Sequence, residues 1–350
     1  MAKRITIKDI SEALGVSRGT VDRALHDRGR IDPKTKEMIL SFAEEMGYIP
    51  NSIARALVMQ HHLSIAAVLP ANPRYFFSII AKGIREASEE MTKAGADVDV
   101  DFIHTKDVGD WNRQIRILED ISEKDYDGVI VVPSNNEKVT PYIDMLAEKG
   151  IPVVTVNNDA PHSKRICYVG EDSIKAGRVA GELLAKFVGR KGKVAILTGY
   201  KDSPSMSERA KGFESYFTGS GTELKLIGPY EYSEKQSVAY DITKKLIEEH
   251  RDLKGIYLTT TTGLTATAKA VVDAERLGDI IVIGPDMSRS INRMMNSNVI
   301  YATIYQAPRE QGYKALTILS RKLANNEDPE TQIVHTDLAV MLKEIREEDY

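Results

Sequence analysis

Two arginines near the start of the chain, Arg18 and Arg23, have the chemistry needed to read DNA bases. A guanidinium group can donate two parallel hydrogen bonds to the major-groove edge of guanine. The apolar spacing around them predicts a short helix whose small and basic side chains point away from its apolar face. The outward positions fit the N-terminal part of a helix in a major groove, and they are Arg18, Gly19, Thr20, Asp22 and Arg23. A plain helical hairpin with a solvated charged face is the alternative.

Three short helices are expected to position these side chains. Gly15 supplies the turn between the first two, because glycine tolerates positive φ at a helix end. Thr6 and Ser17 are expected to cap the first and second helices, and Asp32 with Pro33 to begin the third. The apolar positions predict one small shared core, made of Ile10, Ala13, Leu14, Val21, Ala24, Leu25, Ile39, Phe42, Ala43 and Met46.

The segment that follows, residues 51–60, predicts a very short helix that Asn51 can cap. Such a helix is marginal alone, because nucleation is costly below ~12 residues. The segment is therefore either a disordered linker or a helix that forms only against a partner. Physical considerations alone favour the linker.

From residue 63 onward, apolar segments of strand length alternate with amphipathic segments. The predicted strands are 63–69, 98–103, 128–132, 152–156, 166–169, 193–197, 224–227, 255–258, 280–283 and 300–304, and helical stretches between them include 77–92, 111–121, 176–187, 234–249 and 264–277. Continuous apolar strands alternating with helices are typical of doubly wound parallel sheets. So many strands exceed one comfortable sheet. We therefore expect two α/β lobes with a cleft between them, and a ligand at the carboxyl ends of the strands.

Polar and aromatic residues follow two of these strands. Phe76 and Phe77 come after the first strand, and Asn157, Asn158 and Asp159 come directly after the strand 152–156. A single aromatic residue at such a place is better explained as part of the core, and a polar run as a turn. A small polar ligand, however, needs nearly every hydroxyl paired, which residues of these types at strand ends can provide.

Several short motifs resemble the LacI/GalR family of transcription regulators. They are Thr6-Ile-Lys-Asp-Ile, Gly15-Val-Ser, Thr20-Val, Gly47-Tyr-Ile-Pro-Asn51 and Ala54-Arg-Ala-Leu57. The resemblance implies a helix-turn-helix head at 1–50, a hinge helix or linker at 51–62, and a two-lobed effector-binding and dimerisation domain at 63–350. That domain resembles periplasmic sugar-binding proteins. A two-fold homodimer would read a near-palindromic operator.

The resemblance also implies which residues face DNA. In the family the hinge helix opens the minor groove, and Leu57, supported by Ala54, matches the residue that wedges between bases. Asp22 departs from the family, because an acid facing DNA costs affinity unless it accepts from a cytosine amine or holds Arg23 in place. The full expected set is Thr6, Ser17, Arg18, Gly19, Thr20, Asp22, Arg23, His26, Asn51, Ala54 and Leu57.

For the effector, the resemblance implies a sugar or polyol. Relatives stack an aromatic pair on the sugar, bind its oxygens with an arginine and bind a diol with an aspartate. Asn157 stands where an acid is common, with Asp159 as a conceivable replacement, and Thr260 stands where asparagine is usual. The expected contacts are Phe76, Phe77, Asn157, Asp159, Arg209, Tyr232, Thr260, Asp286 and Gln306. The first lobe would cover about 63–156, the second would begin near Ile166, and the chain would cross back near Asp286 and again near Gln306.

Composition agrees with a protein of this kind. Hydrophobic residues make up 42% and charged residues 28% of the 350 residues, as in ordinary globular proteins of two or three domains. Residues 1–60 contain ten Lys and Arg against eight Asp and Glu, whereas the rest contains 37 against 43. A mildly basic head on an acidic body suits a local DNA contact.

The sequence argues against several other classes. The lone Cys167 excludes a disulfide within the chain and favours a reducing compartment. No apolar run approaches the ~20 residues of a membrane helix, and the N-terminal segment lacks the apolar core of a signal peptide. We therefore expect a cytoplasmic protein.

Enzyme motifs are also lacking. There is no Walker loop, no G-x-G-x-x-G after a strand, no H-E-x-x-H and no G-x-S-x-G. We expect no catalytic residue, no cofactor and no bound metal. A regulator that senses a non-carbohydrate ligand is the stronger alternative, because Asn157 and Thr260 depart from the family. A solute-binding protein for transport is the weaker one.

Overall fold

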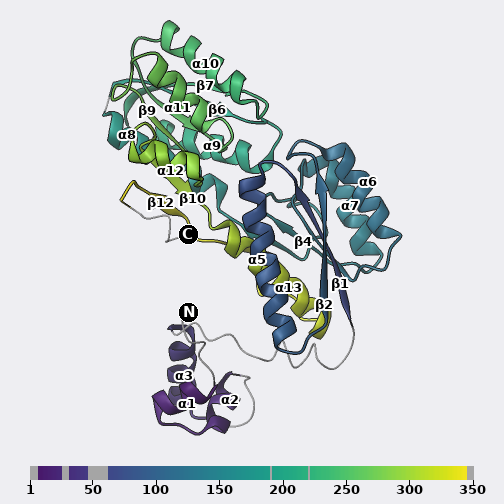
Figure 1. Ribbon diagram of the computed structural model, residues 1–350. Helices are drawn as coiled ribbons and strands as arrows, with labels where there is room; N and C mark the ends of the chain where they lie inside the picture. The colour runs from purple at the N-terminus through teal and green to yellow at the C-terminus, as the bar shows by residue number, and fades with distance from the viewer. Residues whose placement is uncertain (1–6, 26–30, 46–61, 190, 220, 345–350) are drawn as a thin grey trace.

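The computed structural model describes residues 7–25, 31–45, 62–189, 191–219 and 221–344 (Figure 1). The N-terminal head contains helices α1 (Ile7–Leu14), α2 (Arg18–Leu25) and α3 (Pro33–Glu45). Its core is built from Ile10, Val21, Ala24, Ile39 and Ala43. Ala13 was expected in this core but is exposed, because the helix turns it away from α2 and α3.

Local side-chain bonds begin α2 and α3 as predicted. Gly15 has a φ of 65°, and the Ser17 hydroxyl accepts from the Thr20 N–H at 3.1 Å. Asp32 Oδ2 accepts from the Thr35 N–H at 3.0 Å, next to Pro33 as the first residue of α3. Several predicted DNA-facing residues lie outside the described residues, namely Thr6, His26, Asn51, Ala54, Leu57 and the side chain of Asp22.

The rest of the chain forms two six-stranded sheets, which confirms the two-lobed α/β prediction. The first sheet has the order β11 (Ile333–His335), β5 (Cys167–Gly170), β4 (Val153–Val156), β3 (Gly128–Val131), β1 (Leu63–Pro70), β2 (Val98–Thr105), with all neighbours parallel. The second has the order β12 (Ala339–Met341), β10 (Ala302–Tyr305), β9 (Ile281–Pro285), β8 (Leu253–Leu258), β6 (Lys191–Thr198), β7 (Glu223–Glu231). Only β12 is antiparallel to its neighbour there.

Helices cover both faces of each sheet (Figure 1). In the first lobe, α5 (Arg74–Lys93) and α13 (Pro308–Asn325) lie on one face, and α6 (Trp111–Ser122) and α7 (Asn136–Glu148) on the other. In the second lobe, α8 (Ser173–Val188) and α9 (Pro204–Gly219) form one layer. The opposite layer contains α10 (Gln236–Glu249), α11 (Leu264–Asp273) and α12 (Arg289–Asn296). No helix in these described ranges is long and apolar enough to cross a membrane.

The chain passes between the lobes at three places, and two expectations about them were wrong. The strand near Ile166 does not begin the second lobe, because β5 pairs with β4 in the first sheet, with Val154 opposite Cys167. The chain does not cross near Asp286 either, since β9 and β10 pair within the second sheet. It returns near Gln306, as predicted, and crosses once more between β11 and β12.

Thr336 joins the three crossings. Its N–H donates to the Gly170 carbonyl at 2.8 Å, and its hydroxyl donates to the Gln306 carbonyl at 2.9 Å. Gly170, Gln306 and Thr336 belong to the three different crossing segments. Any movement of one lobe against the other therefore acts on a hydrogen-bonded hinge.

Helices α5 and α13 pack backbone against backbone. A Cβ added at Gly312 would lie 2.0 Å from the Ile80 carbonyl oxygen, which is backbone and cannot rotate away. Gly312→Ala should therefore lower the free energy of unfolding by about 1–3 kcal/mol through overpacking, measured by urea denaturation. Gly219→Ala is the matched control, because nothing lies within 4 Å of its added Cβ. Equal stability of the two variants would contradict the close approach.

Candidate functional site

Seven of the nine predicted effector contacts meet in one cavity between the lobes. The cavity has a volume of about 40 Å³. The predicted residues that line it are Phe76, Phe77, Asn157, Arg209, Thr260, Asp286 and Gln306. They come from the N-terminal half of α5, the end of β4, α9, the ends of β8 and β9, and the hinge after β10. Convergence of strand ends at one edge is what places such distant residues together.

The other two predicted contacts do not line this cavity. The Asp159 carboxylate accepts from Arg165 Nε at 2.5 Å and Arg165 NH2 at 2.7 Å, so it holds the turn after β4. The Tyr232 side chain is 0% exposed within the core of the second lobe. Its hydroxyl accepts from the Gly263 N–H at 3.2 Å. Both residues support the walls of the site instead of facing its interior.

Arg209 is the positively charged residue that lines the cavity, and most of its hydrogen-bond donors already have partners. Arg209 Nε donates to Glu171 Oε1 at 2.5 Å, and NH1 donates to the Thr259 carbonyl at 2.7 Å. The remaining nitrogen, NH2, has no hydrogen-bond partner among the described residues. Arg209 therefore has one donor group left for a ligand, and its orientation is set by Glu171.

Asp286 also has one oxygen without a partner. Gln306 Nε2 donates to its Oδ2 at 2.8 Å, whereas Oδ1 accepts no hydrogen bond from the part of the chain described. Burial raises the pKa of this carboxyl to about 7, although Arg209 and Gln306 act in the opposite direction. Keeping the Asp286 carboxyl ionised in the folded protein therefore costs free energy. A ligand that donates a hydrogen bond to it would reduce that cost.

A chain of amides links the two lobes through the hinge. Asn157 Nδ2 donates to Gln306 Oε1 at 2.9 Å, and Gln306 in turn donates to Asp286. An acid at position 157 could only accept, so the departure from the family pattern gives the link its donor. Nearby, the Ser205 N–H of the second lobe donates to Asn158 Oδ1 at 3.4 Å. Hydrogen bonds of residues that line the cavity therefore join the two lobes.

Sequence reasoning missed Glu234, which also lines the cavity. Its Oε1 is buried and accepts no hydrogen bond of normal geometry from the residues described. Burial raises the pKa of the Glu234 carboxyl, and the hydroxyls of Thr262, Thr260 and Tyr232 offset part of this effect. A carboxylate two residues beyond Tyr232 was the available signal.

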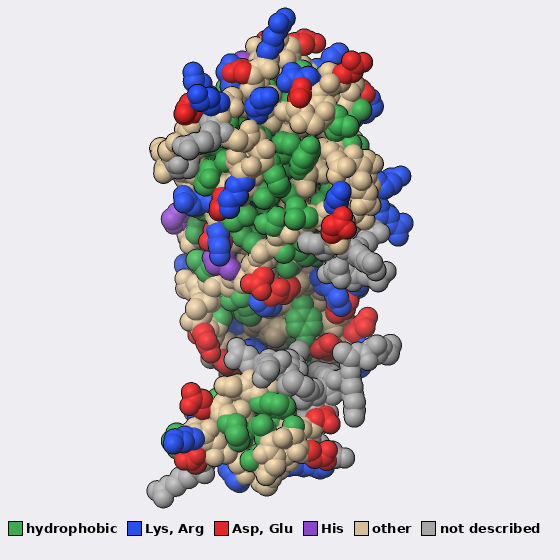
Figure 2. Space-filling model, turned by 90° about the vertical axis from the view of Figure 1, so that its left-hand side faces the viewer, with side chains coloured by type: hydrophobic (Ala, Val, Ile, Leu, Met, Phe, Trp, Pro, Cys, Tyr) green, Lys and Arg blue, Asp and Glu red, His purple; other side chains and the backbone are tan. Residues whose placement is uncertain are grey.

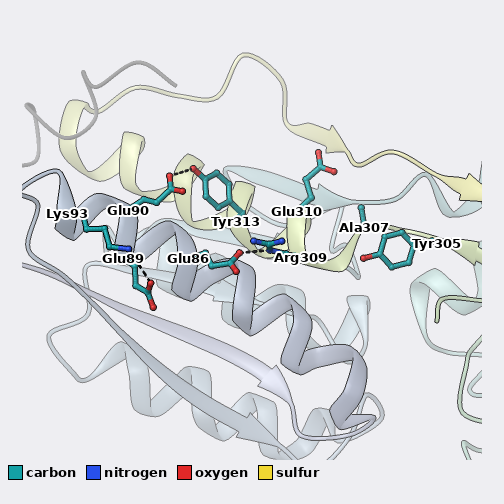
Figure 3. A pocket seen from close by; sticks show the side chains of 9 residues that line it. All are labelled: Glu86, Glu89, Glu90, Lys93, Tyr305, Ala307, Arg309, Glu310 and Tyr313. Carbon is teal, nitrogen blue, oxygen red and sulfur yellow. Dashed lines mark hydrogen bonds and ion pairs between the residues drawn. The ribbon is translucent and has the colours of Figure 1, made fainter. Parts of the chain in front are cut away.

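A larger hollow of about 490 Å³ lies on the outside of the first lobe, between α5 and α13 (Figure 3). Its charged groups pair with each other, within α5 for Lys93 and Glu89 and across the two helices for others. Arg309 Nε donates to Glu86 at 2.5 Å, and the Tyr313 hydroxyl donates to Glu90 at 2.8 Å. None of the predicted effector contacts lines it. The smaller interlobe cavity is therefore the candidate ligand site.

In the head, the predicted base-reading side chains are available on α2. Arg18, Gly19 and Arg23 are exposed. Arg23 NH2 donates to the Thr20 hydroxyl at 3.3 Å, and that hydroxyl lies 2.8 Å from Ser17 Oγ. These polar groups form one surface that runs from the N-terminal end of α2 to Arg23 in its last turn.

Two family models match the chain in succession. Residues 6–51 match the bacterial regulatory proteins of the lacI family, and residues 65–327 match a periplasmic binding protein domain. The chain belongs to the LacI family. The exposed surface of α2 in this LacI-family protein is thus part of a DNA-binding head, and the interlobe cavity lies in a binding-protein domain.

Relatives of this LacI-family protein include both regulators and binding proteins. Catabolite control protein A of Priestia megaterium is 24% identical over 341 residues, which cover 94% of this chain and 96% of that protein. The D-allose-binding periplasmic protein of Escherichia coli (strain K12) is 24% identical, covering 73% of this chain and 82% of the relative. A crystal structure of GanP, a glucose-galactose binding protein from Geobacillus stearothermophilus, superimposes with a TM-score of 0.75. It shares 26% identity and covers 81% of this chain and 99% of that one.

Proposed function

We propose that this protein is a ligand-responsive transcriptional repressor that senses a sugar or polyol and binds a near-palindromic operator as a homodimer. The observation that carries the proposal is the interlobe cavity. Unpaired donor and acceptor atoms of Arg209 and Asp286 meet there beside Phe76 and Phe77, in a chain with a helix-turn-helix head. We assign the head to 1–50, the hinge to 51–62 and the effector domain to 63–350. We further infer that it acts in the cytoplasm, without enzymatic activity or cofactor.

Ligand binding requires the lobes to move. A cavity of about 40 Å³ is far below the ~300–1,000 Å³ typical of small-molecule sites. Entry of a sugar would separate the lobes and rearrange the link from Asn157 through Gln306 to Asp286. Thr336 ties the three interlobe crossings together, so the change would alter the position of one lobe against the other. Through that movement it would reach the hinge at 51–62 and the DNA-binding heads. Coupling of this kind is typically ~1–3 kcal/mol.

The homodimer is supported by apolar side chains on the surface of the second lobe. Figure 2 shows apolar side chains gathered over one face of the body. Large apolar residues exposed in this lobe include Ile174 and Phe187 on α8 and Val340 and Leu342 at β12, each at least 36% exposed. Extended apolar surface on a folded domain is typical of an interaction face.

A ligand screen followed by an operator titration tests the proposal. Thermal shift with sugars, polyols, purines and amino acids should give stabilisation by a sugar or polyol only. That ligand should then change operator affinity. Stabilisation by a purine or an amino acid instead would favour the non-carbohydrate alternative. Ligand binding without any operator binding would favour a solute-binding role.

Replacing Arg23 tests base reading in the head. Arg23→Ala should cost ~1–3 kcal/mol on the cognate operator and relax the preference at one base position, because a bidentate contact is lost. The measurement is a binding titration over operators with single base changes. Lys34→Ala, which removes an exposed charge from α3, is the control and should leave base preference intact. Equal weakening of Arg23→Ala on all sequences would make Arg23 a phosphate contact.

A further inference from the structure

The charged groups that line the interlobe cavity do not balance. Three charged residues line it, namely Arg209, Glu234 and Asp286. Arg209 already forms a buried ion pair with Glu171, and within the described part of the chain neither of the other two carboxylates forms an ion pair. Glu234 also lines the adjoining outer groove, together with three basic residues that do not line the inner cavity, Arg74, Lys106 and Lys235.

Unpaired buried atoms are concentrated at the same place. Among the described residues, seven buried side-chain polar atoms have no hydrogen-bond partner, and four of these belong to residues lining the cavity. The four are Ser203 Oγ, Arg209 NH2, Glu234 Oε1 and Asp286 Oδ1. Asp286 and Arg209 are only 3% and 4% exposed, so solvent does not satisfy them well. The site therefore offers two carboxylate acceptors, one guanidinium donor and one hydroxyl.

The two carboxylates line the same cavity of about 40 Å³. Burial raises the pKa of the Tyr75 hydroxyl, and the charges of Asp286 and Glu234 raise it further. The three groups come from different places, namely the start of α5, the end of β9 and the loop after β7. Both negative charges therefore act on the Tyr75 hydroxyl, at the start of α5.

The chemistry of these atoms distinguishes ligand classes. A neutral hydroxyl can donate one hydrogen bond to a carboxylate but leaves both negative charges buried and uncompensated. A carboxylate on the ligand would add a third negative charge to an interior whose one cation is already paired. A protonated amine donates up to three charge-assisted bonds and supplies the missing positive charge.

We propose that the effector is a polyol that carries a protonated amine, such as an amino sugar. The ammonium group is bound by Asp286 Oδ1 and by the carboxylate of Glu234, and Arg209 NH2 donates to an oxygen of the same ligand. The inference rests on the proposed function, because it places the ligand in the same cavity. It adds a positive charge to the substrate class, which a sugar or polyol alone does not imply.

Calorimetric titration of the full-length protein tests this. The probes are glucosamine, galactosamine and mannosamine, each beside its parent hexose, its N-acetyl derivative and the matching uronic acid where one exists. At least one amino sugar should bind tenfold or more tightly than its parent hexose, and the N-acetyl and uronic forms should bind more weakly than the amine. A parent hexose or a uronic acid that binds as tightly as its amine would overturn the inference and leave the proposed function standing. No binding by any of these sugars would count against the proposed function as well.

A variant pair assigns the preference to Glu234. Glu234→Gln keeps the shape of the side chain and removes its charge, so the affinity ratio of amine to parent hexose should fall at least fivefold. Glu231→Gln removes an exposed carboxylate at the end of β7, three residues before Glu234, that lines neither the cavity nor the outer groove, and it should keep the ratio. An unchanged ratio in Glu234→Gln would overturn the role given to this carboxylate.

Discussion

Asp286→Asn should weaken ligand binding by several kcal/mol while leaving operator affinity without ligand unchanged. The substitution keeps an oxygen for Gln306 but replaces the charged, unpaired Oδ1 of a residue that is 3% exposed. Hydrogen bonds to a buried charge contribute ~1.5–3 kcal/mol each, and a ligand that makes two of them loses both. If the ligand is an inducer, the variant should stay on its operator at ligand concentrations that release the wild type.

The measurement is an operator titration of both proteins with and without the ligand. Asp279→Asn is the control, because this exposed carboxylate of the same lobe lies outside the cavity. Release of Asp286→Asn at the wild-type ligand concentration would mean that Asp286 does not contact the ligand.

The same substitution should stabilise the ligand-free protein at alkaline pH. Burial raises the pKa of Asp286 to about 7 in the folded chain, against ~4 in an unfolded one. Between these values the folded state binds more protons, so the free energy of unfolding of the wild type falls as pH rises from ~4 to ~7. Asp286→Asn lacks this loss and should be more stable than the wild type by on the order of 2–4 kcal/mol at pH 8. Urea denaturation curves of the two proteins with the same midpoint at pH 8 would contradict the buried, unpaired charge.

Arg209→Met should lower the free energy of unfolding by about 3–5 kcal/mol and remove ligand binding. Glu171 would remain buried, with a side chain only 1% exposed, after losing the cation that neutralises it. The loss comes from the stranded charge more than from the absent contact. Adding Glu171→Gln to Arg209→Met should therefore restore a large part of the stability.

Arg165→Met is the matched control for this prediction. Arg165 forms the chain's other deeply buried pair within the described residues, with Asp159, but lines no part of the cavity. The Arg165→Met variant should have a lower free energy of unfolding than the wild type and the same ligand affinity. Urea denaturation and calorimetry on the three variants give both quantities. A double variant as unstable as Arg209→Met alone would contradict the stranded-charge explanation.

Local chemistry was enough to predict most elements of the fold. Gly15 at positive φ, the Ser17 cap and the Asp32 cap each depend on atoms within three residues or on one residue's own backbone. All ten predicted strands are present, because each contains a short apolar segment, although the edge strands β2 and β7 also contain exposed charged residues. The short strands β11 and β12 were missed, since each has only three residues and Met341 is the one buried residue among the six.

By itself, the sequence determined the two-lobed α/β architecture, the helix-turn-helix head and the residue types available at the strand ends. Only the tertiary structure decided how those residues are used. Asp159 is bound by Arg165, Arg209 is held by Glu171, and Asn157 reaches Gln306, a residue 149 positions away. Each polar atom binds whichever partner folding brings within about 3 Å, and that competition among distant residues leaves no periodic trace in the chain. For the same reason, although the place of Glu234 beside Tyr232 in the sequence was a signal of its role, only the assembled lobes show that it lines the cavity.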